Sequence, residues 1–84
     1  MDSAWHVYIL QCADGTLYTG VARNMQRRLQ QHNGELVGGS RYTRGRRPVA
    51  LLWSDTAPDR SVAQSREAAI KRLTRSQKMR LLNC

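Results

Sequence analysis

The stretch WHVYILQCADGTLYTGV, residues 5–21, decides the fold because its pattern predicts a β-hairpin. Asp14-Gly15 is the dipeptide expected in a short hairpin loop, since glycine accepts positive φ. Strand-forming side chains stand on both sides of this turn, namely Val7, Ile9 and Leu17. Tyr8 and Tyr18 therefore lie on adjacent antiparallel strands, where one face of the sheet could display both rings.

Residues 22–34 predict a helix that follows the hairpin. Its expected span is roughly 25–33, because Asn24 can cap the first turn and Asn33-Gly34 can stop the last one. At about 100° per position, one face carries an apolar stripe that consists of Ala22, Met25 and Leu29. We expect this stripe to pack on the core.

Three basic side chains on this helix are not equivalent. Arg28 and His32 lie one turn apart on the flank of the apolar stripe, whereas Arg27 lies roughly opposite and faces solvent. We therefore expect Arg28 and His32 to reach a pocket at the edge of the core, and Arg27 to meet water or a distant phosphate. Taken singly, Arg28 could instead cover the stripe with its stem, and His32 could favour the C-terminal helix dipole.

A glycine-rich basic loop, ELVGGSRYTRGRRP, follows at residues 35–48. Basic side chains interleaved with an aromatic ring suit a nucleic-acid backbone, and a flexible solvated loop is the other interpretation of this composition. The residues expected to contact nucleic acid are Arg41, Tyr42, Arg44, Arg46 and Arg47 in this loop and Lys71 further along the chain.

The second half of the chain predicts one strand and two helices. Residues 49–56, VALLWSDT, form a mostly apolar strand that is long enough to be central in a small sheet. Asp59 or Ser61 can cap the longer helix, and residues 76–83 form a short final one. The buried stripe of the longer helix is expected to be Val62, Ala69, Ile70 and, at its end, Leu73. The order β-β-α-β-α-α predicts a single α+β domain over residues 1–84, with a three-stranded, mainly antiparallel sheet flanked by helices.

The charge balance indicates a polyanionic partner, most simply a nucleic acid. The formal net charge is +8, and arginine, whose planar fork suits bidentate contact with phosphate, supplies most of the positive side. The chain shows no signal-peptide pattern and no apolar run of the roughly 20 residues that span a bilayer, so we expect a cytoplasmic protein without membrane contact. Cys12 and Cys84 fit no zinc spacing or disulfide framework, and we expect reduced thiols with Cys12 in the core.

The segment Val7-Tyr8-Ile9, ten residues before Tyr18-Thr19-Gly20, resembles the paired motif of the GIY-YIG nuclease family. The first half reads VYI instead of GIY, with Val7 in place of glycine, and the second half reads YTG instead of YIG. The following helix, the segment YTRGRRPV, the strand and the segment REAAIKRL extend the resemblance to the small stand-alone bacterial UPF0213 group. The resemblance covers nearly the whole chain.

This resemblance implies a Mg²⁺-dependent phosphodiesterase, with Mn²⁺ as a substitute, that cuts DNA in repair or recombination. The functional residues of the family map onto Tyr8, Tyr18, Arg28, His32 and Glu67, with Glu67 as the metal ligand. A polar amide that the family tends to have near the end of the domain suggests Asn83, which we cannot align securely.

Phosphodiester hydrolysis must activate a water, steady charge on the phosphoryl oxygens and help the leaving oxygen depart. A hard cation serves the last two tasks, and Mg²⁺ needs few carboxylates, so Glu67 alone suffices in a chain with few acids. Arg28 would contact the scissile phosphate. Tyr8 would take a proton from the water or orient it, and we expect Arg28 and a metal to lower its pKa. Tyr18 or His32 could also hold or relay the proton, and the sequence leaves these roles open.

A non-catalytic nucleic-acid-binding module on the same fold is the alternative function. The +8 charge supports it, and 84 residues leave no room for a second domain that recognises a target, so a protein partner could supply recognition. Each functional candidate also has an ordinary interpretation: tyrosines are common in strands, and Glu67 could simply pair with Lys71 one turn on.

Overall fold

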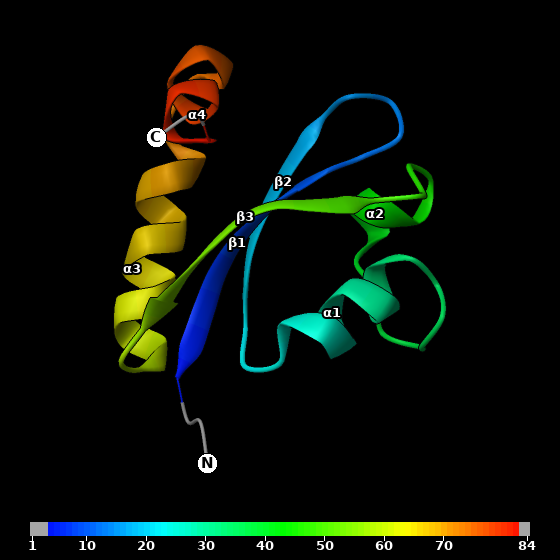
Figure 1. The fold of residues 1–84 in the computed structure, drawn as a ribbon, viewed down its shortest axis with the longest axis horizontal. Coiled ribbons are helices and arrows are strands. Elements are labelled where there is room, and N and C mark those ends of the chain that lie inside the picture. Colours follow the sequence, from blue (N-terminus) through cyan, green and yellow to red (C-terminus); the bar gives the residue numbers. More distant parts are fainter. Residues whose placement is uncertain (1–3, 83–84) are drawn as a thin grey trace.

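The computed structural model describes residues 4–82 and confirms the predicted α+β architecture (Figure 1). The predicted element order is also confirmed, with one additional short helix between the first helix and the third strand. The elements are β1 Trp5–Gln11, β2 Leu17–Ala22, α1 Met25–His32, α2 Arg41–Arg44, β3 Ala50–Ala57, α3 Arg60–Lys71 and α4 Arg75–Leu82. None of the helices within residues 4–82 is long and apolar enough to cross a membrane.

The sheet is antiparallel throughout and has the strand order β2-β1-β3. Gly15 adopts φ 85° in the tight turn between β1 and β2, as the Asp14-Gly15 dipeptide predicts. The prediction that the third strand is central is wrong, because the hairpin places β1 in the middle and leaves β3 paired on one side only. The length of β3 instead matches that of β1, along which it pairs from end to end.

Two apolar clusters lie on the two faces of β1, because successive strand residues point to opposite faces. Val7 and Ile9 face α3, where they pack with Ala63 and Ile70. The opposite face belongs to α1 and consists of Tyr8, Leu10, Cys12, Ala22 and Val49, with Met25 and Leu29 packed against it. In Figure 1 the sheet accordingly stands between α3 on one side and α1 with α2 on the other. The predicted core position of Cys12 is confirmed.

Side-chain caps explain where the helices begin. The Asn24 side chain accepts a hydrogen bond from the backbone N–H of Arg27 at 3.0 Å and begins α1, as predicted. Asp59, rather than the alternative Ser61, caps α3 by accepting from the N–H of Val62 at 2.9 Å. Helix α4 begins one residue before the predicted start, and Asn83 and Cys84 lie outside the described residues.

The prediction for the buried face of α3 is partly wrong. Ile70 is buried, but Ala69 is exposed and Ala63 is buried in its place. Ala63 and Ile70 are seven residues apart and lie on the same side of a helix, whereas residue 69 points about 100° away from residue 70.

Candidate active site

Three aromatic rings meet on the α1 face of the sheet. Tyr8 and Tyr18 lie on this face of β1 and β2 with ring centroids 6.4 Å apart, so the predicted shared face is confirmed. The last residue of α1, His32, brings its ring to 6.0 Å from that of Tyr8 and 5.1 Å from that of Tyr18. Tyr42 in α2 lies against the outer side of Tyr18, at 5.5 Å.

A buried hydrogen-bond chain runs from Tyr8 into the segment that carries α2. The Tyr8 hydroxyl lies 2.9 Å from His32 Nε2, and His32 Nδ1 lies 2.8 Å from the Thr43 hydroxyl oxygen. The Thr43 hydroxyl lies in turn 3.2 Å from the backbone carbonyl of Ser40. His32 and Thr43 are both 0% exposed and Tyr8 is 1% exposed, so these polar groups depend on partners inside the protein for their hydrogen bonds.

Burial controls the ionisation of Tyr8. It raises the pKa of Tyr8 to about 12, since a phenolate at this position would lose its hydration. The Arg28 guanidinium lowers the pKa, as the sequence predicts, but its effect is smaller than that of burial, and the charges of Tyr18 and Glu67 raise the pKa further. The expected lowering of the pKa by Arg28 is therefore confirmed, but in the protein alone the larger effect of burial outweighs it. Tyr8 is a neutral phenol at pH 7.

His32 is a neutral imidazole for the same reason. Burial, together with the charges of Arg28 and Arg47, lowers the pKa of His32 from 6.5 to about 4. A neutral imidazole has one N–H donor and one free nitrogen acceptor. His32 can therefore join Tyr8 and Thr43 as an acceptor on one side and a donor on the other.

Arg28 is held beside Tyr8, on the flank of α1 where the helical period places it. Its Nη1 donates to the side-chain oxygen of Gln31 at 3.0 Å and to the carbonyl of Gly38 at 2.8 Å. Arg28 is half-buried and Arg27 is exposed, which confirms the predicted difference between them. The two bonds fix the direction of the Arg28 side chain, and its guanidinium also forms a hydrogen bond with the Tyr8 hydroxyl.

Glu67 lies on α3, and its charge is the smallest of the causes that shift the pKa of Tyr8. Its side chain is 22% exposed, and one carboxylate oxygen lies 3.6 Å from Lys71 Nζ, one turn further along the helix. Within residues 4–82 no three His, Cys, Asp or Glu side chains gather as a metal-binding group. A single carboxylate nevertheless suits Mg²⁺, which keeps several waters and takes further oxygens from a phosphate.

Residues 4–80 match the family described as the GIY-YIG catalytic domain. The chain belongs to the GIY-YIG family. The UPF0213 protein of Desulfotalea psychrophila is 54% identical to it over 79 residues, which are 94% of this chain and 71% of the relative. The UPF0213 protein of Halobacterium salinarum is 47% identical over 73 residues, which are 87% of this chain and 92% of the relative.

Two solution NMR structures share the fold. The protein EF2693 from E. faecalis superimposes with a TM-score of 0.66 at 37% identity, over 98% of this chain and 85% of that chain. The UPF0213 protein from Bacillus halodurans gives 0.61 at 37% identity, over 95% and 83%. The predicted UPF0213 resemblance is thus confirmed, although the group is wider than the bacterial set expected, since its members also come from archaea.

The final glycine of the GIY-YIG motif has a steric role in this chain. Gly20 pairs with Tyr8 across the β1–β2 ladder. A Cβ atom added at Gly20 would lie 2.6 Å from Tyr8 Cζ and closer still to the hydroxyl oxygen. The bare backbone of β2 therefore provides the space in which the Tyr8 hydroxyl meets His32.

We expect the Gly20→Ala substitution to lower the free energy of unfolding by about 1–3 kcal/mol, the usual cost of overpacking a tight site. The buried Tyr8 ring cannot move aside without breaking its bond to His32. Gly45→Ala is the matched control, because a Cβ at Gly45 would meet nothing within 4 Å, and its effect should stay within about 0.5 kcal/mol. Urea denaturation followed by tryptophan fluorescence measures both variants. Equal stabilities of the two variants would contradict the steric role of Gly20.

The structure divides the six residues predicted to bind nucleic acid into two groups. Arg41, Tyr42 and Arg44 are exposed on α2, with Tyr42 at 37%. The other three have partners within the chain: Arg46 binds Asp14, Arg47 donates from Nε to the His32 carbonyl at 2.7 Å, and Lys71 pairs with Glu67. The first group is therefore the better candidate for contact with a substrate.

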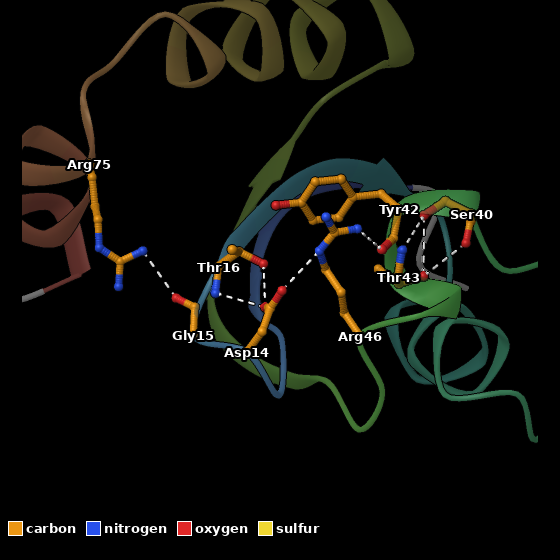
Figure 2. Close-up of polar contacts among 8 residues, drawn as sticks. All are labelled: Asp14, Gly15, Thr16, Ser40, Tyr42, Thr43, Arg46 and Arg75. Carbon is orange, nitrogen blue, oxygen red and sulfur yellow. Dashed lines mark hydrogen bonds and ion pairs between the residues drawn. The ribbon is translucent and has the colours of Figure 1, made fainter.

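Arg46 forms hydrogen bonds with both Asp14 and Tyr42 (Figure 2). Its Nε donates to the Asp14 carboxylate at 3.0 Å, and its Nη1 donates to the Tyr42 carbonyl at 2.8 Å. Its guanidinium carbon also lies 4.1 Å from the centroid of the Tyr42 ring, a cation–π distance. Arg46 thus ties the turn of the β1–β2 hairpin to α2.

Sequence reasoning missed α2 and the buried Thr43. The signal for the helix is weak, since it consists of one turn that is capped by the Ser40 side chain, which accepts from the N–H of Thr43 at 3.3 Å. Serine is a residue type that often caps a helix, so Ser40 is compatible with a helix that begins at the next residue. Nothing in a loop rich in glycine and arginine shows that one threonine points inward.

Proposed function

We propose that this chain is a metal-dependent endonuclease that hydrolyses phosphodiester bonds in DNA. The observation that carries the proposal is the buried Tyr8–His32 hydrogen bond, together with the hydrogen bond and charge of Arg28 and the charge of Glu67 that act on Tyr8. Membership of a family of catalytic domains supports a nuclease-type activity. The +8 charge supports a nucleic-acid substrate.

Tyr8 and His32 act together on the attacking water. The water gives a proton to the Tyr8 oxygen while Tyr8 passes its own proton to His32 Nε2, and the water oxygen forms the new bond to phosphorus. The bond from phosphorus to the sugar oxygen breaks, and this oxygen takes a proton from solvent water. This relay avoids a free phenolate, which a pKa of about 12 makes unfavourable. The negative charge of the bound phosphate offsets the cations near His32 and makes its ring a stronger base.

The surrounding residues hold the phosphate. Arg28 is fixed by Gln31 and Gly38, so its remaining donors form a preorganised contact for the phosphoryl oxygens, worth several kcal/mol when charge develops there. The Tyr18 hydroxyl orients the water or the phosphate beside His32. Glu67 would hold Mg²⁺, or Mn²⁺ in its place, and the bound ion supplies charge neutralisation at the phosphate and the leaving oxygen. Lys71 competes for this carboxylate and must release it.

The exposed face of α2 contacts the substrate away from the reacting phosphate. Arg41 and Arg44 bind phosphates. Tyr42, whose ring already lies against Arg46 and Tyr18, offers the part of its ring that stays exposed. These contacts favour binding without strong sequence preference and with steep salt dependence. A protein partner would direct such a domain to its target, and we place its role in DNA repair or recombination within the cytoplasm.

The test of this function compares Glu67→Ala with Glu35→Ala, an exposed glutamate outside this pocket. The substrates are labelled branched, single-stranded and duplex DNA with Mg²⁺, with Mn²⁺ or with chelator. We expect metal-dependent cuts by the native chain, at least about 100-fold slower cleavage by Glu67→Ala and normal cleavage by Glu35→Ala. DNA binding in chelator should be similar in all three proteins.

Unchanged cleavage by Glu67→Ala would refute the metal assignment. Binding without cuts under either metal would favour the alternative, a non-catalytic nucleic-acid-binding module. The Glu67–Lys71 ion pair is the observation that favours this second function, because it is a stable arrangement that needs no metal.

A further inference from the structure

Thr43 is the far end of the hydrogen-bond chain that begins at Tyr8, and its hydrogen-bond partners determine which nitrogen of His32 carries the proton. Three groups surround the Thr43 hydroxyl oxygen: His32 Nδ1 at 2.8 Å, the Ser40 carbonyl at 3.2 Å and the Ser40 hydroxyl at 3.2 Å. A hydroxyl has one hydrogen to donate and two lone pairs that accept.

The Ser40 carbonyl can only accept, and it lies 3.2 Å from the Thr43 hydroxyl, which donates to it beside the backbone N–H of Arg44. Thr43 is then an acceptor towards His32, and the imidazole must carry its proton on Nδ1. The free nitrogen, Nε2, accepts from the Tyr8 hydroxyl. In this arrangement every buried hydrogen on the path from Tyr8 to Ser40 has an acceptor.

In the opposite arrangement, fewer buried polar groups have a hydrogen-bond partner. If Thr43 donated to Nδ1, the Nε2–H of His32 would point at the Tyr8 oxygen. The Tyr8 hydroxyl hydrogen would then have no acceptor among the hydrogen bonds of the described residues, in a side chain that is 1% exposed. Such an unsatisfied buried donor is costly.

We propose that Thr43 is a positioning residue that holds His32 in the Nδ1–H tautomer and so leaves Nε2 free to receive the proton of Tyr8. The inference rests on the proposed function for its catalytic meaning, but the tautomer is a property of the protein alone. In the opposite tautomer Nε2 already carries a proton and the relay cannot run. After the transfer the imidazolium still donates from Nδ1 to Thr43.

The contacts of Arg46 with Asp14 and Tyr42 explain how Thr43 keeps its position. The Arg46–Asp14 ion pair fixes the segment 40–46 to the hairpin turn (Figure 2). The contact between Tyr42 and Tyr18 fixes the same segment to β2. The same short helix that carries exposed arginines towards a substrate therefore also carries the threonine that orients the buried histidine. In the proposed mechanism, one segment therefore contacts the nucleic acid and also keeps Nε2 of His32 free to accept a proton.

The test compares Thr43→Val, which keeps the shape but removes the hydroxyl, with Thr43→Ser, which keeps the hydroxyl. Long-range ¹H–¹⁵N NMR of protein with ¹⁵N-labelled histidine at pH 7 reports the tautomer of His32, with His6 as the second resonance set. We expect Nδ1–H in the native chain and in Thr43→Ser, and a shift towards Nε2–H in Thr43→Val. In the cleavage assay kcat should fall about 10-fold in Thr43→Val with little change in KM, and Thr43→Ser should restore it.

If His32 of the native chain is in the Nε2–H tautomer, the inference is wrong. This result needs no variant and does not depend on whether the protein cleaves DNA. A Thr43→Val protein that folds and keeps the native tautomer would also overturn it. If the tautomer shifts as expected while no protein cleaves DNA with any metal, the positioning role of Thr43 stands and the proposed nuclease function fails.

Discussion

Replacing Tyr8 with phenylalanine is expected to reduce the rate of DNA cleavage roughly 10²–10⁴-fold, the usual contribution of a proton-transfer group. The ring of phenylalanine fills the same space beside Gly20, so the packing of this face of the sheet is retained. What is lost is the hydroxyl that bonds to His32 and that, in the proposed mechanism, passes a proton to it from the water. The free energy of unfolding should fall by only about 1–2 kcal/mol, because one buried hydrogen bond is broken.

Tyr42→Phe is the matched control, since it removes the same atom from a tyrosine that is exposed and not part of the proton path. Single-turnover cleavage at saturating protein separates the chemical step from binding, and a filter-binding titration in chelator measures the dissociation constant. Tyr8→Phe should lower the single-turnover rate with an unchanged dissociation constant, and Tyr42→Phe should leave the rate near the native value. Cleavage by Tyr8→Phe within 10-fold of the native rate would exclude Tyr8 from the reaction.

The parts of this site that could be predicted from sequence are those governed by local geometry. The turn dipeptide fixes the hairpin, and the hairpin fixes which face of the sheet Tyr8 and Tyr18 share. The period of a helix likewise separates Arg28 and His32 from Arg27 before any tertiary contact is known. The family motif adds Glu67, which no local pattern in the sequence relates to Tyr8.

The features that could not be predicted depend on tertiary contacts and on the burial that these contacts produce. The sequence shows that Arg28 is near Tyr8 and predicts a lower pKa, but it does not show the degree of burial, whose larger effect raises the pKa to about 12. It presents Arg46 as one more cation of a basic loop, although Asp14, 32 residues away, binds it. Thr43 was missed for a similar reason, since its function depends on contact with a histidine 11 residues earlier.

Acid is expected to destabilise this protein through His32. Burial lowers the pKa of His32 to about 4 in the folded state. As the pH falls, the unfolded chain therefore binds a proton on His32 near pH 6.5, whereas the folded chain binds it only near pH 4. Stability therefore falls as the pH decreases from about 6.5 to about 4, with a slope that approaches 1.4 kcal/mol per pH unit. The whole window corresponds to a loss of about 3 kcal/mol, a large share of the stability of a small domain.

His32→Gln isolates this effect, because an amide can accept from Tyr8 and donate to Thr43 but does not titrate. Urea denaturation at half-unit steps between pH 7 and pH 4 gives the free energy of unfolding for both proteins. The hydrogen bonds of Thr16 and the charge of Arg46 lower the pKa of Asp14, but Asp14 is common to both proteins and cancels in the difference. We expect the two curves to converge by about 3 kcal/mol as the pH falls. Parallel curves would show that His32 accepts a proton in the folded state as readily as in the unfolded one. The Tyr8–His32–Thr43 chain would then lack the neutral imidazole on which the proton relay depends.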